Sequence, residues 1–372
     1  MPSSPPPLHE RSHALLSRVW AQPNQPPLQL AIPPERVDDG NAASPAPPQF
    51  QPHLHYFQVR VNEMYLSRRR EWVTTYDPLV FTVTEFIYHR RHVALPFVVG
   101  PTMLEAYGRQ LPLGMLFTNT RIAGPYPYRG GRIALAIVLY RVRRDNAIRN
   151  VLRLLERVAG VVDVADMVHT YIKLADVLLD GMETLLSADA TEPRIGVRME
   201  LDPAATGAIR PGYYVLLEPQ ATQVNPAHLR VREQQLWYGA DAGSAEPFRS
   251  SDYVLYSLMQ TSERSDLTTL AFYPLYEQVL AAAIHPDAEN WKRARINLLT
   301  LIQNIELSPD LTSAQARALS RHYTERVLQA HHHAAQIGTL GSRAVAHQQR
   351  SSPDLSAQAQ QRWHELARYL EL

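Results

Sequence analysis

The chain has 372 residues, of which 45% are hydrophobic and 20% are charged, and its formal net charge is +1 at pH 7. These proportions are those of a globular protein, and a net charge near zero excludes strong long-range attraction of the whole molecule to nucleic acid or to an anionic membrane. Cysteine is absent, which excludes disulfide frameworks, thiolate zinc sites, iron–sulfur clusters and cysteine nucleophiles.

The first residues and the hydropathy of the chain predict where the protein resides. The opening MPSSPPPLHERSHALL lacks the basic region followed by an apolar region that a signal peptide requires. The sequence contains no apolar run long enough to predict a transmembrane helix. Every basic residue except Lys173 and Lys292 is arginine, a bias that a GC-rich genome explains most simply. We therefore expect a cytoplasmic bacterial protein.

Residues 1–52 contain 13 of the 29 prolines and are predicted to form a flexible tail, because such a segment buries too little apolar surface to offset its ordering entropy. A short amphipathic helix is expected within it, over residues 9–22. A helix this short needs a surface on which to dock, either its own globular domain or a groove on a partner protein. The second interpretation gives a candidate partner-docking site formed by Leu15, Leu16, Val19 and Trp20.

Residues 53–262 are predicted to form a β-sandwich domain. Phe57, Val59 and Val61 alternate with polar residues, which is the period of a half-buried strand. In residues 132–142 both alternating sets are apolar, so this strand is expected to be central, with a second sheet on one face and helices on the other. Further strands are expected at 79–88, 92–101, 194–201, 212–219, 228–239 and 251–260.

A helical hairpin is predicted to interrupt the sandwich at 146–186. Its first helix has apolar residues at helical spacing and ends at Gly160. Its second helix carries an apolar stripe that ends at Leu185, opposite a row of five polar residues. Two interpretations fit this pattern: the hairpin packs on a sheet, or it rearranges into a bilayer as the hairpins of pore-forming proteins do.

Residues 263–372 read as helices, which completes the expected fold. The class is α+β: a mainly antiparallel β-sandwich interrupted by a helical hairpin and followed by a C-terminal helical bundle.

Common catalytic and metal-binding motifs are missing from the sequence. There is no P-loop, no G-x-S-x-G elbow, no H-E-x-x-H and no paired set of EF-hand ligands. The run His331–His333 is an unsuitable metal site, because consecutive helical residues point in different directions. His53 and His55 share one face of a predicted strand and could pair on a metal, although this is the weaker interpretation. No catalytic residue, metal or other cofactor is predicted.

Arginine clusters lie at the ends of several predicted strands. If the sheet brings these ends together, they form a cationic rim that could bind an acidic protein surface, lipid headgroups or a nucleic-acid backbone. Aromatic residues interleaved with basic ones are sparse, which disfavours nucleic acid. The predicted anion-binding rim consists of Arg69, Arg70, Arg90, Arg91, Arg143 and Arg144.

These observations favour a non-enzymatic protein-interaction or assembly subunit of a bacterial multi-protein system, with a protein as its partner. Two alternatives stay open. One is a membrane-perturbing effector that uses the helical hairpin at 146–186, and the other is an enzyme whose site is assembled from distant loops. The sequence pattern sets no oligomeric state.

Overall fold

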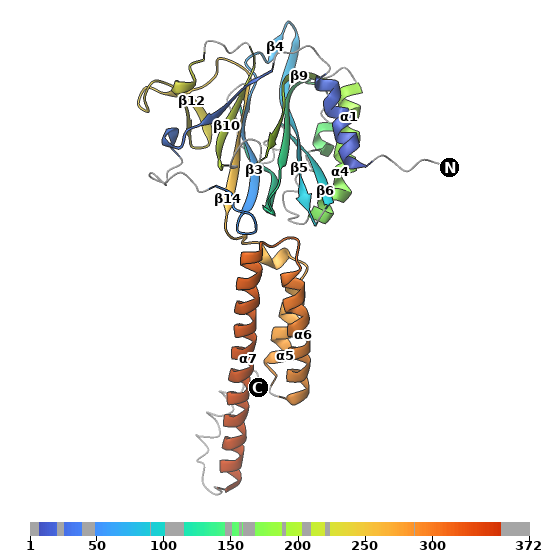
Figure 1. Cartoon of the computed structure of the whole chain (residues 1–372), viewed down its shortest axis with the longest axis vertical. Helices are drawn as coiled ribbons and strands as arrows, with labels where there is room; N and C mark the ends of the chain where they lie inside the picture. The colour runs from blue at the N-terminus through green and yellow to red at the C-terminus, as the bar shows by residue number, and fades with distance from the viewer. Residues whose placement is uncertain are drawn as a thin grey trace, which may run out of the picture. The chain divides into compact units, whose positions relative to one another are not determined.

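The computed structural model describes residues 7–20, 26–38, 49–89, 91–100, 115–145, 151–155, 158, 168–187, 191–202, 210–219, 224–285 and 287–350. The chain divides into two compact units. The β unit comprises residues 1–270 and 308–316, and the helical unit comprises 271–307 and 317–372. Antiparallel sheets and C-terminal helices confirm the predicted α+β class (Figure 1).

Two five-stranded antiparallel sheets form the centre of the β unit. The first sheet has the order β1-β10-β14-β3-β7, with β1 (Leu28–Ile32), β10 (Gly212–Leu217), β14 (Tyr253–Thr261), β3 (Tyr56–Tyr65) and β7 (Met115–Pro127). The second has the order β4-β5-β8-β9 with β6 also paired to β5, and comprises β4 (Arg70–Glu71), β5 (Thr74–Tyr88), β8 (Ile133–Arg143), β9 (Thr191–Leu201) and β6 (Arg91–Val99).

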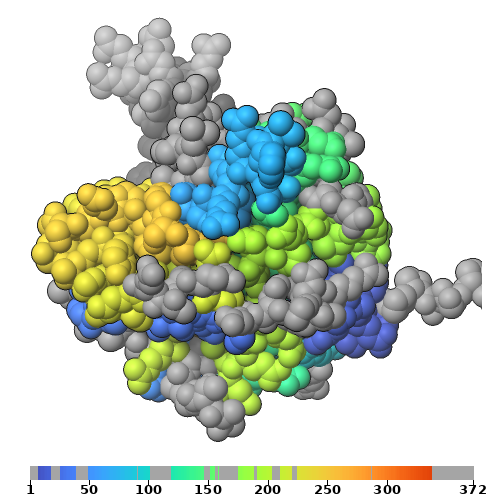
Figure 2. Space-filling model, turned by 90° about the horizontal axis from the view of Figure 1, so that it is seen from above, coloured from blue at the N-terminus to red at the C-terminus, as the bar shows by residue number. Residues whose placement is uncertain are grey.

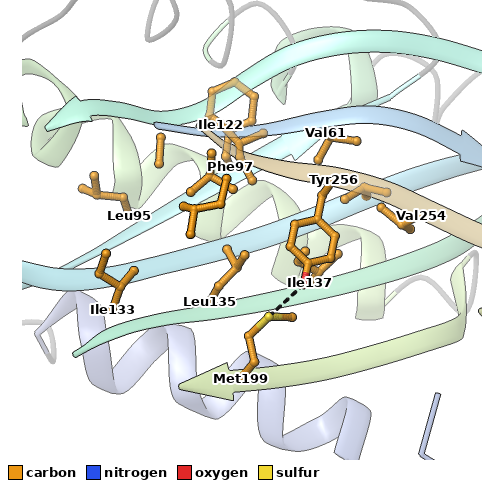
Figure 3. Close-up of a cluster of buried hydrophobic side chains, with 14 of the residues drawn as sticks. Val61, Leu95, Phe97, Ile122, Ile133, Leu135, Ile137, Met199, Val254 and Tyr256 are labelled. Carbon is orange, nitrogen blue, oxygen red and sulfur yellow. Dashed lines mark hydrogen bonds between the residues drawn. The ribbon is translucent and has the colours of Figure 1, made fainter. Parts of the chain in front are cut away.

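The main hydrophobic core lies between these two sheets. The alternation in β3 buries Phe57, Val59 and Val61 there, as the sequence predicts. Figure 3 shows this core, in which the Tyr256 hydroxyl donates a hydrogen bond to the Met199 sulfur across the two sheets at 3.1 Å. Buried side chains of β6, β8 and β14 complete it, among them Leu95, Phe97, Ile133, Leu135, Ile137, Leu139, Val254 and Leu258.

Strand β8 is covered on both faces, which confirms the prediction for residues 132–142. Its odd-numbered residues, such as Ile137, belong to the core between the sheets. Its even-numbered residues, such as Val138 and Tyr140, belong to a second core that includes side chains of the helices. A strand buried in this way shows no hydrophobic-to-polar alternation, because neither of its faces meets water.

Helices cover the outer face of the second sheet. They are α1 (Leu8–Trp20), the helical residues 151–155 and α4 (Val168–Ser187) (Figure 1). Helix α1 lies against the polar row of α4, where Arg11 forms ion pairs with Asp176 at 2.7 Å and with Asp180 at 2.5 Å. The apolar stripe of α4 is buried against the sheet, through Ala175, Leu178, Leu179, Met182 and Leu185.

The described part of residues 1–52 therefore differs from the flexible tail that its proline content predicts. Helix α1 and strand β1 both belong to the β unit, and Ile32 of β1 is 5% exposed. Composition averages over a segment, whereas burial depends on a few apolar side chains that meet a complementary face.

A small sheet covers the outer face of the first sheet. It has the order β13-β12-β11-β2, with β13 (Glu246–Pro247), β12 (Gln235–Tyr238), β11 (Leu229–Arg232) and β2 (Val37–Asp38). The sequence predicts one strand over 228–239, but the structure has two strands joined at Glu233 and Gln234. Both residues have positive φ, 51° and 64°, as the two-residue turn of a hairpin requires.

In the part of the helical unit that the structure describes, three helices pack together. They are α5 (Tyr273–Ala283), α6 (Ala288–Glu306) and α7 (Ser313–Arg350), of which α7 begins in the β unit. Tyr276 stacks on Tyr323 at 3.9 Å between ring centroids, and Trp291 stacks on His331 at 3.7 Å. Short 3-10 turns occur in the β unit at Pro34–Arg36, Pro226–His228 and Leu267–Thr269. None of the helices described is long and apolar enough to cross a membrane.

The boundary between the units differs from the predicted one at 262/263. The β unit continues to Leu270 and includes the later segment 308–316. Arg264, which is 3% exposed, explains the difference: its backbone N–H donates to Gln315 Oε1 at 3.2 Å and its guanidinium donates to the Asp310 carbonyl at 3.1 Å.

Candidate protein-docking site

The turn between β4 and β5 presents two apolar side chains to solvent. Trp72 is 93% exposed and Val73 is 91% exposed, the highest values among the large apolar residues that the structure describes. They are the two turn residues of a hairpin in which Glu71 pairs with Thr74. Figure 1 labels β4 at the uppermost end of the second sheet. Figure 2 looks down on that end and shows this light-blue part of the chain facing the viewer. We call Trp72 and Val73 the tip.

The backbone at the tip is in an unfavourable conformation for its residue types. Trp72 has a φ of +53°, in the left-handed region. Two-residue hairpin turns favour asparagine, aspartate and glycine, which adopt positive φ at low cost, whereas a bulky aromatic residue there is strained. Strain of this kind concentrates at binding sites, and it points to a use for the exposed indole.

A buried carboxylate holds the base of the tip. Asp77 accepts hydrogen bonds from Arg69 at 2.7 Å and from Arg144 Nε at 2.8 Å, and Arg144 also donates a second bond to it through Nη2. Burial opposes ionisation of Asp77, but the hydrogen bonds from the two arginines outweigh it and hold the pKa of Asp77 below its ordinary value. The carboxylate is therefore ionised at neutral pH and ties β4, β5 and the end of β8 together.

A backbone hydrogen bond and a third arginine also hold the base of the tip. The Tyr76 N–H donates to the Arg69 carbonyl at 2.7 Å. Arg141 lies over the Tyr76 ring, 4.5 Å from its centroid, and pairs with Glu71 at 3.1 Å and with Glu192. The tip is thus an exposed apolar end on a rigid support, so little conformational entropy is lost when a partner binds it.

The surface around the tip is cationic. Residues 68–77 and 141–145 contain six arginines and three carboxylates. With Glu192, Arg194, Glu218 and Asp252, which are joined to them by ion pairs, the set has seven arginines and six carboxylates and a local net charge of +1. Arg68, Arg70 and Arg143 are exposed there. An anionic surface is therefore the complementary one.

Only part of the predicted arginine rim assembles. Arg69, Arg70, Arg143 and Arg144 lie together at the base of the tip, since Arg143 is in register with Tyr76 and Arg70 with Thr75. Arg91 is in register with Tyr88, twelve residues further along β5, which is about 40 Å away at the rise of a strand. The β5–β6 turn is at the opposite end of β5 from the tip, so a rim of six arginines does not form. Arg90 lies outside the described residues.

The predicted partner-docking residues of the first helix are placed differently from the tip. Leu15 and Leu16 are 2% and 0% exposed and pack in the core under α1, so they contact the chain's own domain. The side chains of Val19 and Trp20 lie outside the described part of the structure.

Trp72 and Val73 are not among the residues that the sequence pattern predicts, because the arginines beside them are the stronger signal. A signal for the tip does exist in SRRREWVTTYDP. An aromatic and a β-branched residue stand between two short β-forming pieces where a turn residue is expected.

A polar cluster lies under α1, around Glu85. Buried Glu85 lies 3.3 Å from Arg198, 3.3 Å from His13 and 3.7 Å from His92. It joins α1 to the second sheet, which is a structural role. In the described part of the chain, no group of three or more His, Cys, Asp or Glu side chains could hold a metal ion.

The chain was compared with family models, curated proteins and solved structures, and none of them matches it.

Proposed function

We propose that the chain is a non-enzymatic protein-interaction or assembly subunit that docks on a partner protein through Trp72 and Val73. The observation that carries the proposal is the exposure of these two side chains, 93% and 91%, on a hairpin fixed at its base by Asp77. Tryptophan and arginine are the residue types most enriched among those that dominate binding energy at protein interfaces.

The charges around the tip define the partner. The apolar turn fits a pocket on the partner surface, and exposed Arg68, Arg70 and Arg143 favour carboxylates around that pocket. Burial of the indole supplies affinity, whereas the arginines chiefly raise the association rate and make it dependent on salt.

The test is affinity capture from the source organism with the full chain, comparing Trp72→Ala with a matched control. Ile87→Ala is suitable, because Ile87 is 46% exposed and lies near the other end of β5. We expect a protein that the unmodified chain and Ile87→Ala both recover and Trp72→Ala does not. With the purified partner, Trp72→Ala should weaken binding by about 30-fold or more, the effect of losing a dominant interface residue.

Equal recovery by Trp72→Ala and the unmodified chain would contradict the proposal. So would a purified partner that binds both with the same Kd. Circular dichroism of the variant provides the folding control, because removal of an exposed side chain should leave the fold intact.

The membrane-perturbing alternative requires α4 to leave the second sheet. Its residues Leu178, Leu179 and Met182 are fully buried against that sheet, and this burial opposes its release. Dye leakage from anionic vesicles over a range of pH distinguishes the two functions, since leakage by the unmodified chain would favour the membrane-perturbing alternative.

A further inference from the structure

Helix α6 is apolar on two opposite sides. One side packs inside the helical unit and consists of Ala294, Leu298, Leu301 and Ile305. At 100° per residue, Ile296, Leu299 and Leu307 lie on the other side of the helix. Those three side chains are 57%, 66% and 78% exposed. A surface helix normally has one apolar stripe and a polar opposite face, so the second stripe indicates a second partner surface.

The charges along the exposed side identify that partner. Lys292, Leu299 and Glu306 are each seven residues apart, so they form one line along α6. Lys292 and Glu306 are both exposed, and each is about 10 Å from Leu299 along the helix axis. From the N-terminal end of α6, this line therefore carries a positive, an apolar and a negative side chain at equal spacing.

Such a line is complementary to itself when a second copy runs antiparallel. A two-fold axis at Leu299 places Lys292 of each copy opposite Glu306 of the other, with the leucines in contact at the centre. Parallel pairing would instead bring two lysines together and two glutamates together, which is repulsive.

We infer that α6 pairs antiparallel with α6 of a second copy of the chain, through a two-fold interface centred on Leu299. Ile296 and Leu307 widen the apolar part of this interface. The Ser320 hydroxyl of α7 donates to Glu306 Oε1 at 3.0 Å, so one oxygen of this carboxylate is already bound within the helical unit. The interface lies in the helical unit and is independent of the tip.

The first experiment measures the mass of the full chain in solution by sedimentation equilibrium. We expect a dimer, and we expect Leu299→Asp to weaken self-association by about 30-fold or more, because it places a charge at the centre of the interface. Ile284→Asp is the matched control: Ile284 is 55% exposed at the end of α5 and is not part of the exposed stripe of α6. It should leave the dimer unchanged.

A charge exchange tests the antiparallel direction. Lys292→Glu and Glu306→Lys should each weaken the dimer about tenfold, and the double variant should restore it, because opposite charges then face each other again. Neither single change should unfold α6. A glutamate near its N-terminal end and a lysine at its C-terminal end both suit the helix dipole.

Three outcomes would overturn the inference. The first is a monomer at about 100 µM chain, in which case the stripe is covered by the chain itself or by another protein. The second is a dimer that survives Leu299→Asp, and the third is a double charge variant as weak as the single ones. The variant Trp72→Ala should remain dimeric, so failure of this inference and failure of the proposed docking function are separable.

Discussion

At the scale of single residues, the tip depends on one carboxylate. Asp77 is buried and compensated by Arg69 and Arg144, which brings three strand ends together. Replacing Asp77 with asparagine leaves two arginines without their counter-charge, so we expect the free energy of unfolding to fall by about 3 kcal/mol. Chemical denaturation measures the change. Asp145→Asn is the control, because Asp145 forms a solvent-accessible pair with Arg143 at 3.8 Å and should matter by less than about 1 kcal/mol.

The same residue makes the effect depend on pH. The folded protein lowers the pKa of Asp77 below its ordinary value of 3.8, so ionised Asp77 stabilises the fold above that pH. The difference in unfolding free energy between the unmodified chain and Asp77→Asn should be constant at neutral pH. It should shrink as the pH falls from about 4 through the folded pKa of Asp77, because the protonated aspartate is neutral, as asparagine is at every pH. A difference that grows on acidification would contradict this assignment.

Single residues also show what alternation in a sequence can predict. The faces of Phe57, Val59 and Val61 follow from a period of two, because successive strand side chains point to opposite sides. The exposure of Trp72 does not follow from any period. It depends on where the chain turns, and the turn is stabilised by Arg144, which follows β8 and lies about 70 positions away.

At the scale of elements, α1 is part of the core rather than an appendage. Leu16→Ala should lower the free energy of unfolding by about 2–5 kcal/mol, because it removes a fully buried side chain and leaves a cavity. Leu154→Ala is the matched control, since Leu154 is 54% exposed on a neighbouring helical segment, and it should cost well under 1 kcal/mol. Equal effects of the two substitutions would show that α1 leaves the sheet in solution.

The elements differ in how well the sequence predicts them. The stripe of α4 is predictable because it is a long run with one helical period, and the double burial of β8 is predictable because both of its alternating sets are apolar. The hairpin of β11 and β12 reads as one strand, because its turn residues, Glu233 and Gln234, are not typical turn residues. Strand β1 is not predictable from the sequence, because its five residues lie among prolines and it is stabilised by antiparallel pairing with β10, nearly 190 residues later.

At the scale of the whole molecule, the chain leaves the β unit and returns to it. After α6, the segment 308–316 packs against β3 and the residues that follow β14. Gln315 is the centre of this return: its Oε1 accepts from the Tyr56 hydroxyl at 2.5 Å and from the Arg264 N–H, and its Nε2 donates to the Arg264 carbonyl at 3.1 Å.

We expect Gln315→Ala to lower the free energy of unfolding of the β unit by about 3 kcal/mol. It removes the acceptor of the Tyr56 hydroxyl and the side-chain partner of the Arg264 backbone N–H and carbonyl, and buried polar groups that lose a hydrogen bond are costly. Gln303→Ala, at an exposed position of α6, is the control and should have little effect. Near-ultraviolet circular dichroism follows the buried tyrosines of this unit. An unchanged transition in Gln315→Ala would show that segment 308–316 does not stabilise it.

The sequence by itself determined the α+β class, the central strand, the apolar stripe of α4 and the helical C-terminal region, because these depend on local patterns of apolar residues. Only the structure decided between the two interpretations of that stripe, since it buries α4 on the second sheet. Tertiary structure alone decided that four of the arginines gather at one end of β5, where Arg69 and Arg144 bind Asp77, that Arg91 lies far from them, and that Leu15 and Leu16 are buried. It also decided that Trp72 is exposed and that α6 keeps a second apolar face. The physical reason is that pairing register and burial are set by contacts between residues distant in the chain, which no local pattern records.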